Sequence, residues 1–191
     1  MATDPKMPRL IDQANNSMNY LTVLIADLLQ ATRMSEGQPA LRKSHFKLSA
    51  LIANCCSYIR LNEEYKLIAE GDEDLTIYAD ADRIDQVLTN FISNAIKYAS
   101  LSKVIKIVIE DLGNEAKVSV IDEGPGIAAD KVEQFFKKYY GIDLEGNQDS
   151  GLGLGLYISS EIIKRHNGSI GVESIVNRGS KFWFTLPKEI V

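Results

Sequence analysis

The first part of the chain carries a helical pattern. Apolar and small side chains recur there at alternating steps of four and three, which is a heptad-like stripe. Gly37 and Pro39 end the pattern, so the sequence predicts one helix of about 25 residues. Nothing nearby can cover the stripe; we expect dimerisation in a helix bundle, the alternative being a helix that lies on its own domain. The stripe consists of Leu10, Ala14, Met18, Leu21, Ile25, Leu28 and Thr32.

A change of pattern near residues 36–44 marks a domain boundary, and helical and strand periodicities alternate beyond it. The predicted helices are 49–62, 81–99 with Asp80 as N-cap, and 155–165. The predicted strands are 47–49, 65–69, 75–79, 104–110, 115–121, 169–174 and 180–186. We therefore expect an α/β (α+β) two-layer sandwich, with one mixed sheet packed on three helices and one long helix in front.

The helix predicted for residues 81–99 has a polar face whose side chains suit a metal ion and phosphate. Asn90, Asn94 and Lys97 stand at i, i+4 and i+7, so they project from one side, while the opposite side is apolar. Carboxamide oxygens are hard ligands that suit Mg²⁺, and a lysine ammonium is a point charge for phosphate. The pattern is also compatible with an ordinary polar surface stripe.

Two glycine-containing segments are candidates for ligand contact. Residues 122–127, DEGPGI, follow a predicted strand. The carboxylate of Asp122 is followed by two glycines, and because glycine has no side chain, a flat ligand can approach the backbone there. Asp122 could accept a hydrogen bond from an exocyclic amine such as that of adenine, although a plain turn is the alternative. Residues 151–156, GLGLGL, open a helix, where free N–H groups favour phosphate. The spacing fits neither the dinucleotide fingerprint nor a P-loop.

The composition of the chain argues against some classes of partner and location. The formal net charge of the 191 residues is −5, which argues against general nucleic-acid binding. Cys55 and Cys56 are adjacent, so we expect free thiols in a reducing compartment. The acidic run 70–74 is expected to be a solvated loop rather than a metal site. No stretch predicts a membrane span or a signal peptide, so we expect a cytoplasmic chain; membrane anchorage of its parent protein stays open.

Taken in order, these segments resemble the ATP-binding catalytic domain of sensor histidine kinases, within the ATPase superfamily that includes gyrase and heat-shock chaperones. The resemblance covers roughly residues 45–188 and rests on five motifs. These are the N box at 80–98, the first glycine box at 122–127, the F box at 136–140, the second glycine box at 151–155 and the segment 178–180. Residues 18–37 resemble the second helix of the dimerisation and phosphoacceptor hairpin.

The resemblance implies a site for ATP and Mg²⁺. Asn94 would coordinate the metal ion with help from Asn90, and Asp122 would bind the adenine amine. The segment 131–150 would be a mobile lid. Gly141 stands where the family has a basic residue, so Lys137 or Lys138 would contact phosphate instead. The other implied nucleotide contacts are Lys97, Tyr98, Gly124, Gly126, Ile127, Gly151, Gly153, Leu154, Gly155 and Leu156.

The implied function is that of a two-component kinase core that transfers the γ-phosphate of ATP to a histidine outside this chain. Residues 1–40 would be a partial hairpin and 45–191 the catalytic domain. Neither His45 nor His166 is followed by an acidic residue, so neither matches a phosphoacceptor. Expected partners are the parent's phosphoacceptor helix, a response regulator receiver domain and a second copy bound through the first helix. The alternatives are a non-catalytic binding module, an anti-sigma type serine kinase, and an ATP hydrolase, against which Asn90 argues because an amide cannot act as a general base.

Overall fold

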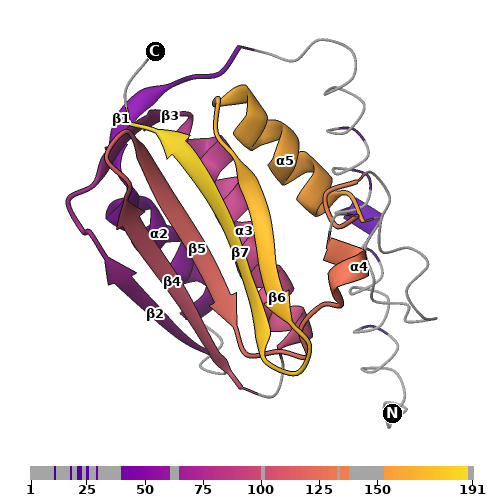
Figure 1. Cartoon of the computed structure of the whole chain (residues 1–191). Coiled ribbons are helices and arrows are strands. Elements are labelled where there is room, and N and C mark those ends of the chain that lie inside the picture. Colours follow the sequence, from indigo (N-terminus) through magenta and orange to yellow (C-terminus); the bar gives the residue numbers. More distant parts are fainter. Residues whose placement is uncertain are drawn as a thin grey trace, which may run out of the picture.

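The computed structural model describes residues 11, 18, 21–22, 25, 29, 40–60, 65–99, 102–132, 134–137 and 153–188, and of residues 58–60 the backbone only (Figure 1). The described residues of the predicted first helix are helical. Its apolar members are exposed, from 52% for Leu29 to 67% for Met18. The rest of that helix, including Leu10, Ala14, Leu28 and Thr32, lies outside the described residues.

The body contains a mixed sheet, as predicted, and it has five strands. Its order is β2-β4-β5-β7-β6, in which β2 and β4 are parallel and the other neighbours antiparallel. The strands are β2 (Lys66–Gly71), β4 (Val104–Asp111), β5 (Glu115–Asp122), β6 (Ile170–Ile175) and β7 (Gly179–Pro187).

Two strands form a separate antiparallel sheet, which sequence reasoning missed. β1 (Ser44–Lys47) pairs with β3 (Thr76–Ala79), and the ring of His45 lies 4.9 Å from that of Tyr78. The strand predicted at 47–49 therefore lies further upstream, because residues from Leu48 onward are already helical. His45 is exposed and lies on β1.

Three helices cover one face of the large sheet: α2 (Leu48–Arg60), α3 (Ala81–Tyr98) and α5 (Gly155–Arg165) (Figure 1). The apolar side of α3 is buried, and the ring of Phe91 lies 5.5 Å from that of Phe182 and 6.1 Å from that of Phe184. A short helix, α4 (Ala129–Val132), was not predicted. The predicted two-layer sandwich is confirmed.

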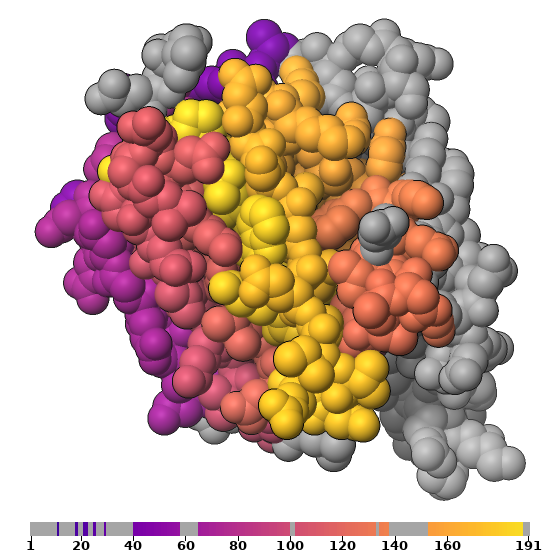
Figure 2. Space-filling view, in the orientation of Figure 1, coloured from indigo at the N-terminus to yellow at the C-terminus, as the bar shows by residue number. Residues whose placement is uncertain are grey.

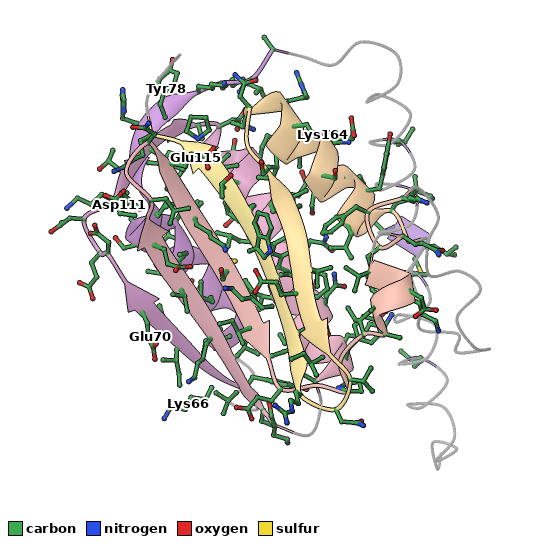
Figure 3. All side chains as sticks on the ribbon, in the orientation of Figure 1. Lys66, Glu70, Tyr78, Asp111, Glu115 and Lys164 are labelled. Carbon is green, nitrogen blue, oxygen red and sulfur yellow. The ribbon has the colours of Figure 1, made fainter. Side chains whose placement is uncertain are left out.

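The other face of the sheet is turned toward the viewer in Figure 1, and in the space-filling view of Figure 2 residues of β4, β5 and β7 form the surface there. On this face Lys117 Nζ lies 4.7 Å from the centre of the Trp183 ring, and Glu173 pairs with Lys181 at 3.7 Å. The charged side chains labelled in Figure 3 lie around the periphery of the body, with Lys164 on the outer side of α5. Among the described residues, no helix combines the length and apolar character needed to cross a membrane.

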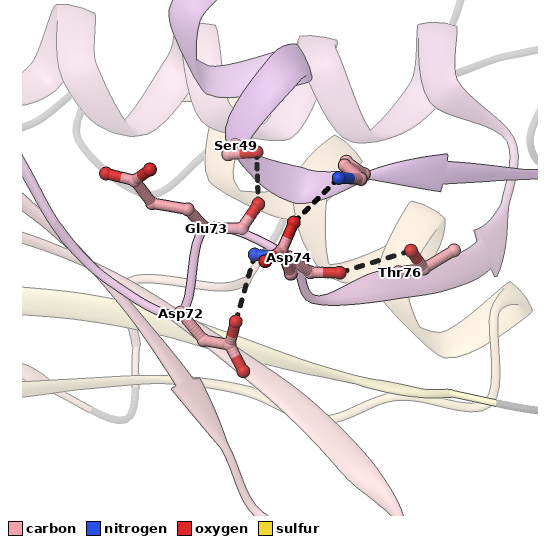
Figure 4. Close-up of polar contacts among 6 residues, drawn as sticks. Ser49, Asp72, Glu73, Asp74 and Thr76 are labelled. Carbon is pink, nitrogen blue, oxygen red and sulfur yellow. Dashed lines mark hydrogen bonds and ion pairs between the residues drawn. The ribbon is translucent and has the colours of Figure 1, made fainter.

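The acidic loop after β2 stabilises its own turn, in agreement with its predicted role (Figure 4). Asp72 Oδ1 accepts the backbone N–H of Asp74 at 2.9 Å, and Lys47 donates to the Asp74 carboxylate at 2.7 Å. Ser49 donates to the carbonyl of Glu73 at 2.6 Å. The carboxylates of Asp72 and Asp74 therefore make contacts within the loop and to β1, and the hydroxyl of Ser49 joins the loop to the start of α2.

Asp80 caps α3 as predicted, and it joins three segments. Its carboxylate accepts the backbone N–H groups of Arg83 at 3.3 Å and Arg42 at 2.8 Å. Its own backbone N–H donates to Nε2 of His166, 3.0 Å away at the end of α5. His166 Nδ1 lies 2.8 Å from the carbonyl oxygen of Ile162, so Nδ1 carries the proton and Nε2 accepts.

His166 therefore has a structural role, which its neutral ring performs through these two hydrogen bonds. Burial is the main cause that lowers its pKa below 6.5; Lys43 and Arg165 lower it further, while the hydrogen bond to Ile162 and the charge of Asp80 oppose the shift. The unfolded chain thus takes up this proton more readily than the folded chain. The stability that the neutral ring contributes is complete above pH 6.5 and is lost as the pH falls below it.

We expect the free energy of unfolding to decrease as the pH falls below 6.5, and His166→Gln to remove part of that decrease. Urea titrations at pH 8 and pH 5.5 measure it. His45→Gln is the matched control, because it removes the other histidine, which is exposed on β1. An unaltered pH dependence in His166→Gln would contradict this role.

The two cysteines agree with the prediction of free thiols. Cys55 and Cys56 are both buried and neither forms a disulfide. The Sγ of Cys55 lies 3.4 Å from the hydroxyl of Thr89 on α3, and burial raises the pKa of its thiol. A raised pKa disfavours the reactive thiolate, so Cys55 acts as part of the core between α2 and α3.

Candidate nucleotide and metal site

Three elements meet at the predicted site: the second half of α3, the loop that follows β5, and the first turn of α5. The elements approach closely at two glycines, where an added Cβ would require neighbouring atoms to move. A Cβ at Gly155 would lie 2.5 Å from Oδ1 of Asn90, and one at Gly124 would lie 3.1 Å from the carbonyl oxygen of Tyr98. The structure therefore joins the N box to both glycine boxes, as their proposed roles require.

Asn90 is held by α5. Its side-chain Nδ2 donates to Oγ of Ser159 at 3.0 Å, and that hydroxyl donates to the carbonyl oxygen of Gly155 at 3.0 Å. Ser159 is 1% exposed. Sequence reasoning missed this serine, although its position four residues after Gly155 places the two on one helical face. The oxygen of the Asn90 amide therefore lies at the first turn of α5.

The other candidate residues of α3 are at least partly exposed. Asn94 is partly exposed, and Lys97 and Tyr98 are exposed. Lys97 Nζ lies 5.1 Å from the centre of the Tyr98 ring, a cation–π distance. Asn90, Asn94 and Lys97 thus share the non-core face of α3, as their spacing predicted.

Asp122 ends β5 and is 6% exposed. Its Oδ1 accepts the backbone N–H of Gly124 at 2.8 Å, and the backbone N–H of Ser180 also bonds to the carboxylate. Burial raises the pKa of the carboxyl above 3.8, while these two hydrogen bonds oppose the shift. A buried carboxylate with so little access to water gains from a ligand that brings a hydrogen-bond donor.

The loop 122–127 is fastened to the hairpin of β6 and β7. Gly126 has φ +69°, and a Cβ there would lie 2.1 Å from the carbonyl oxygen of Ile175. The N–H of Ile127 donates to Oγ of Ser174 at 2.8 Å, and that hydroxyl donates to the carbonyl of Gly179 at 2.9 Å. The sequence did not predict this contact of Ser174, because its hydrogen bond to Ile127 depends on the pairing of strands far apart in sequence.

The start of α5 has the geometry of an anion site. Gly153 has φ +63°, and the buried Leu154 stands at the N-cap position, where its side chain makes no capping hydrogen bond. The first N–H groups of a helix lack internal partners, so they are available to phosphate oxygens. Leu156 is half-buried in the first turn. Gly151 lies outside the described residues.

The structure describes only part of the F box and of the predicted lid. Phe135 and Phe136 are half-buried, and the ring of Phe135 lies 6.5 Å from that of Phe182. Lys137 is exposed, whereas Lys138 and most of the predicted lid, 131–150, lie outside the described residues.

The donor set fits Mg²⁺ bound together with a nucleotide. Within the described residues no group of three or more His, Cys, Asp and Glu side chains could hold a metal ion. The asparagine amides can supply one or two oxygen ligands, which matches the way Mg²⁺ is shared between a protein and phosphates.

Comparison with known proteins agrees with this geometry. Residues 79–190 match the family model described as histidine kinase-, DNA gyrase B-, and HSP90-like ATPase. The adaptive-response sensory kinase SasA of Crocosphaera subtropica is 34% identical over 184 residues, which cover 94% of this chain and 48% of the relative. The chain thus spans about half the length of the curated relatives that it matches.

Solved structures give the same family. The catalytic domain of the histidine kinase ThkA is 32% identical with a TM-score of 0.68, covering 78% of this chain and 97% of that domain. A complex of ThkA with the response regulator protein TrrA aligns at 27% identity and a TM-score of 0.79, over 99% of this chain and 53% of that one. Full-length ShkA with AMPPNP shares the fold at a TM-score of 0.84 and 24% identity, over 100% of this chain and 41% of ShkA. The chain belongs to the histidine kinase-, DNA gyrase B- and HSP90-like ATPase family, and its body is an ATP-binding catalytic domain of the histidine kinase type.

Proposed function

We propose that this chain binds Mg²⁺–ATP and transfers the γ-phosphate to a histidine on a segment outside it, as the catalytic part of a two-component sensor kinase. The observation that carries the proposal is Asp122, a buried carboxylate at the end of β5 beside a glycine loop, with α3 in contact with both that loop and the start of α5. Its acceptor atoms suit the exocyclic amine of adenine, and Gly126 and Ile127 would line the base pocket.

The other residues of the site would hold the phosphates. The N–H groups at Gly153–Leu156 would bind phosphate oxygens, and Lys97 and Lys137 would add positive charge. Asn94, helped by Asn90, would hold Mg²⁺ through amide oxygens. The metal ion would neutralise phosphate charge during transfer. Further nucleotide contacts are proposed for Tyr98, Gly124, Lys138 and Gly151.

The side chain of Asn90 favours transfer of the γ-phosphate over hydrolysis of ATP. Hydrolysis needs a group that takes a proton from water, and an amide has no such basicity. The Nδ2 of Asn90 is moreover engaged with Ser159. We therefore favour the kinase over an ATP hydrolase. A non-catalytic module and an anti-sigma type serine kinase remain the alternatives.

The phosphoacceptor is proposed to lie outside this chain, which contains two histidines. His166 is 3% exposed and both its ring nitrogens are engaged, while the ring of His45 on β1 lies tilted against that of Tyr78 on β3. A phosphoacceptor helix of the parent kinase and a response regulator receiver domain are the proposed partners, and the cytoplasm the proposed location. The exposed apolar residues Met18, Leu21 and Ile25 support a homodimer through the first helix, with residues 1–40 as part of its hairpin.

The metal ligand can be tested directly. We expect Asn94→Ala to lower the affinity for Mg²⁺–ATP by about tenfold, because one oxygen ligand is lost. The affinity for ATP in excess EDTA should not change, since the adenine contact at Asp122 is intact. Calorimetric titration of ATP with Mg²⁺ and with EDTA measures both values.

Asn54→Ala is the matched control, because Asn54 is an exposed asparagine on another helix, α2. It should bind both forms of ATP as the wild type does. Equal losses with and without Mg²⁺ in Asn94→Ala would remove Asn94 from the metal site. A wild-type chain that binds ATP no better with Mg²⁺ than with EDTA would count against the whole metal site.

A further inference from the structure

A polar contact crosses from α3 to α5 inside the proposed site. Asn90 Nδ2 donates to Ser159 Oγ at 3.0 Å, and Ser159 Oγ donates to the carbonyl oxygen of Gly155 at 3.0 Å. Ser159 is almost completely buried. Gly155 leaves room for the amide, since a Cβ there would come within 2.5 Å of Asn90 Oδ1. The three residues thus form a small network between the two helices.

The network determines whether the NH₂ group or the oxygen of the Asn90 amide faces Ser159. A serine hydroxyl has one proton, and here it is given to the carbonyl of Gly155, one helical turn earlier. Toward Asn90 the hydroxyl can therefore only accept, so the NH₂ group must face Ser159. The carbonyl oxygen of the amide is left on the side of the first turn of α5.

We propose that Ser159 is a positioning residue that presents the oxygen of Asn90, and not its nitrogen, to the Mg²⁺ and phosphates. The proposal rests on the proposed function and adds to it the residue that orients the second amide. An oxygen is a ligand for Mg²⁺, whereas an amide NH₂ would repel the cation. With Ser159 in place the amide is oriented before the metal arrives, so no reorganisation opposes binding.

The arrangement also connects metal binding to the phosphate end of the site. Ser159 bonds to the carbonyl of Gly155, the residue that begins α5, so the amide and the first turn share one hydroxyl. A substitution at 159 should therefore affect the metal-dependent part of nucleotide binding and leave the adenine contact at Asp122 unaffected.

The experiment compares four chains by calorimetric titration of ATP, once with Mg²⁺ and once with excess EDTA. In Ser159→Ala the amide can turn over, and we expect the affinity for Mg²⁺–ATP to fall about tenfold with no change in EDTA. Ser159→Thr keeps the hydroxyl and should restore most of the affinity. Ser160→Ala is the matched control, because Ser160 is the next residue of α5 and is also buried. It should equal the wild type in both titrations.

The side-chain NH₂ resonances of Asn90 give a readout besides nucleotide binding. In the wild type they should show slow exchange with solvent, because Nδ2 donates to a buried oxygen, and Ser159→Ala should abolish that protection. A fall of equal size with and without Mg²⁺ in Ser159→Ala would overturn the proposal, as would an unchanged ratio of the two affinities. If the wild type itself showed no Mg²⁺ dependence, the metal site would fail together with this proposal; a normal wild type with an unchanged Ser159→Ala ratio would overturn only the role of Ser159.

Discussion

Replacing Asp122 by asparagine is expected to weaken ATP binding about ten- to a hundredfold, since a charge-assisted hydrogen bond contributes about 1.5–3 kcal/mol. The carboxylate offers only acceptors to the adenine amine, whereas an amide can turn an NH₂ group toward it. The loss should be the same with Mg²⁺ and with EDTA, because the contact is to the base. Calorimetric titration with ATP measures it.

The fold should tolerate this change. Burial raises the pKa of Asp122, which means that the ionised carboxylate opposes folding at neutral pH, and a neutral asparagine removes that opposition. We therefore expect the free energy of unfolding to change by less than about 1 kcal/mol. Asp111→Asn is the control, because Asp111 ends the neighbouring strand and pairs with Lys188 at the surface. Unchanged ATP affinity in Asp122→Asn would remove this residue from the site.

Gly126→Ala should both destabilise the chain and abolish most nucleotide binding. A non-glycine residue at φ +69° costs about 1–2 kcal/mol. The new Cβ would in addition lie 2.1 Å from the backbone oxygen of Ile175, and such overpacking costs about 1–3 kcal/mol more. The loop that carries Asp122 must then move away from the β6–β7 hairpin. Urea unfolding and ATP titration measure the two effects.

Gly113 offers a control that separates the two causes. It has φ +87° in the turn between β4 and β5, and a Cβ there would meet nothing within 4 Å. Gly113→Ala should therefore show only the cost of the backbone conformation and bind ATP normally. If the two alanine variants lost equal stability, the close approach of the loop to the hairpin would not matter.

Local signals in the sequence predicted much of this fold. The core face of α3, its cap at Asp80, and the ends of β5 and α5 all follow from periodicity, turn residues and glycine spacing. These features depend on residues a few positions apart, where side-chain direction is fixed by the element itself. The three asparagine and lysine positions of the N box were located for the same reason.

The contacts that complete the site could not be predicted in this way. Asn90 and Ser159 are 69 positions apart, and Asp80 and His166 are 86 apart. Each bond depends on how α3 and α5 pack, which no local pattern determines. The pairing of β1 with β3, in place of one continuous sheet, likewise depends on contacts distant in sequence.

The most direct test of the account is the structure of the chain crystallised with Mg²⁺ and a non-hydrolysable ATP analogue. We predict the adenine amine within hydrogen-bonding distance of the Asp122 carboxylate and the phosphates at the first turn of α5. The metal ion should be bound by the amide oxygen of Asn94, with that of Asn90 beside it. A nucleotide bound elsewhere, or one whose base does not reach Asp122, would contradict the account.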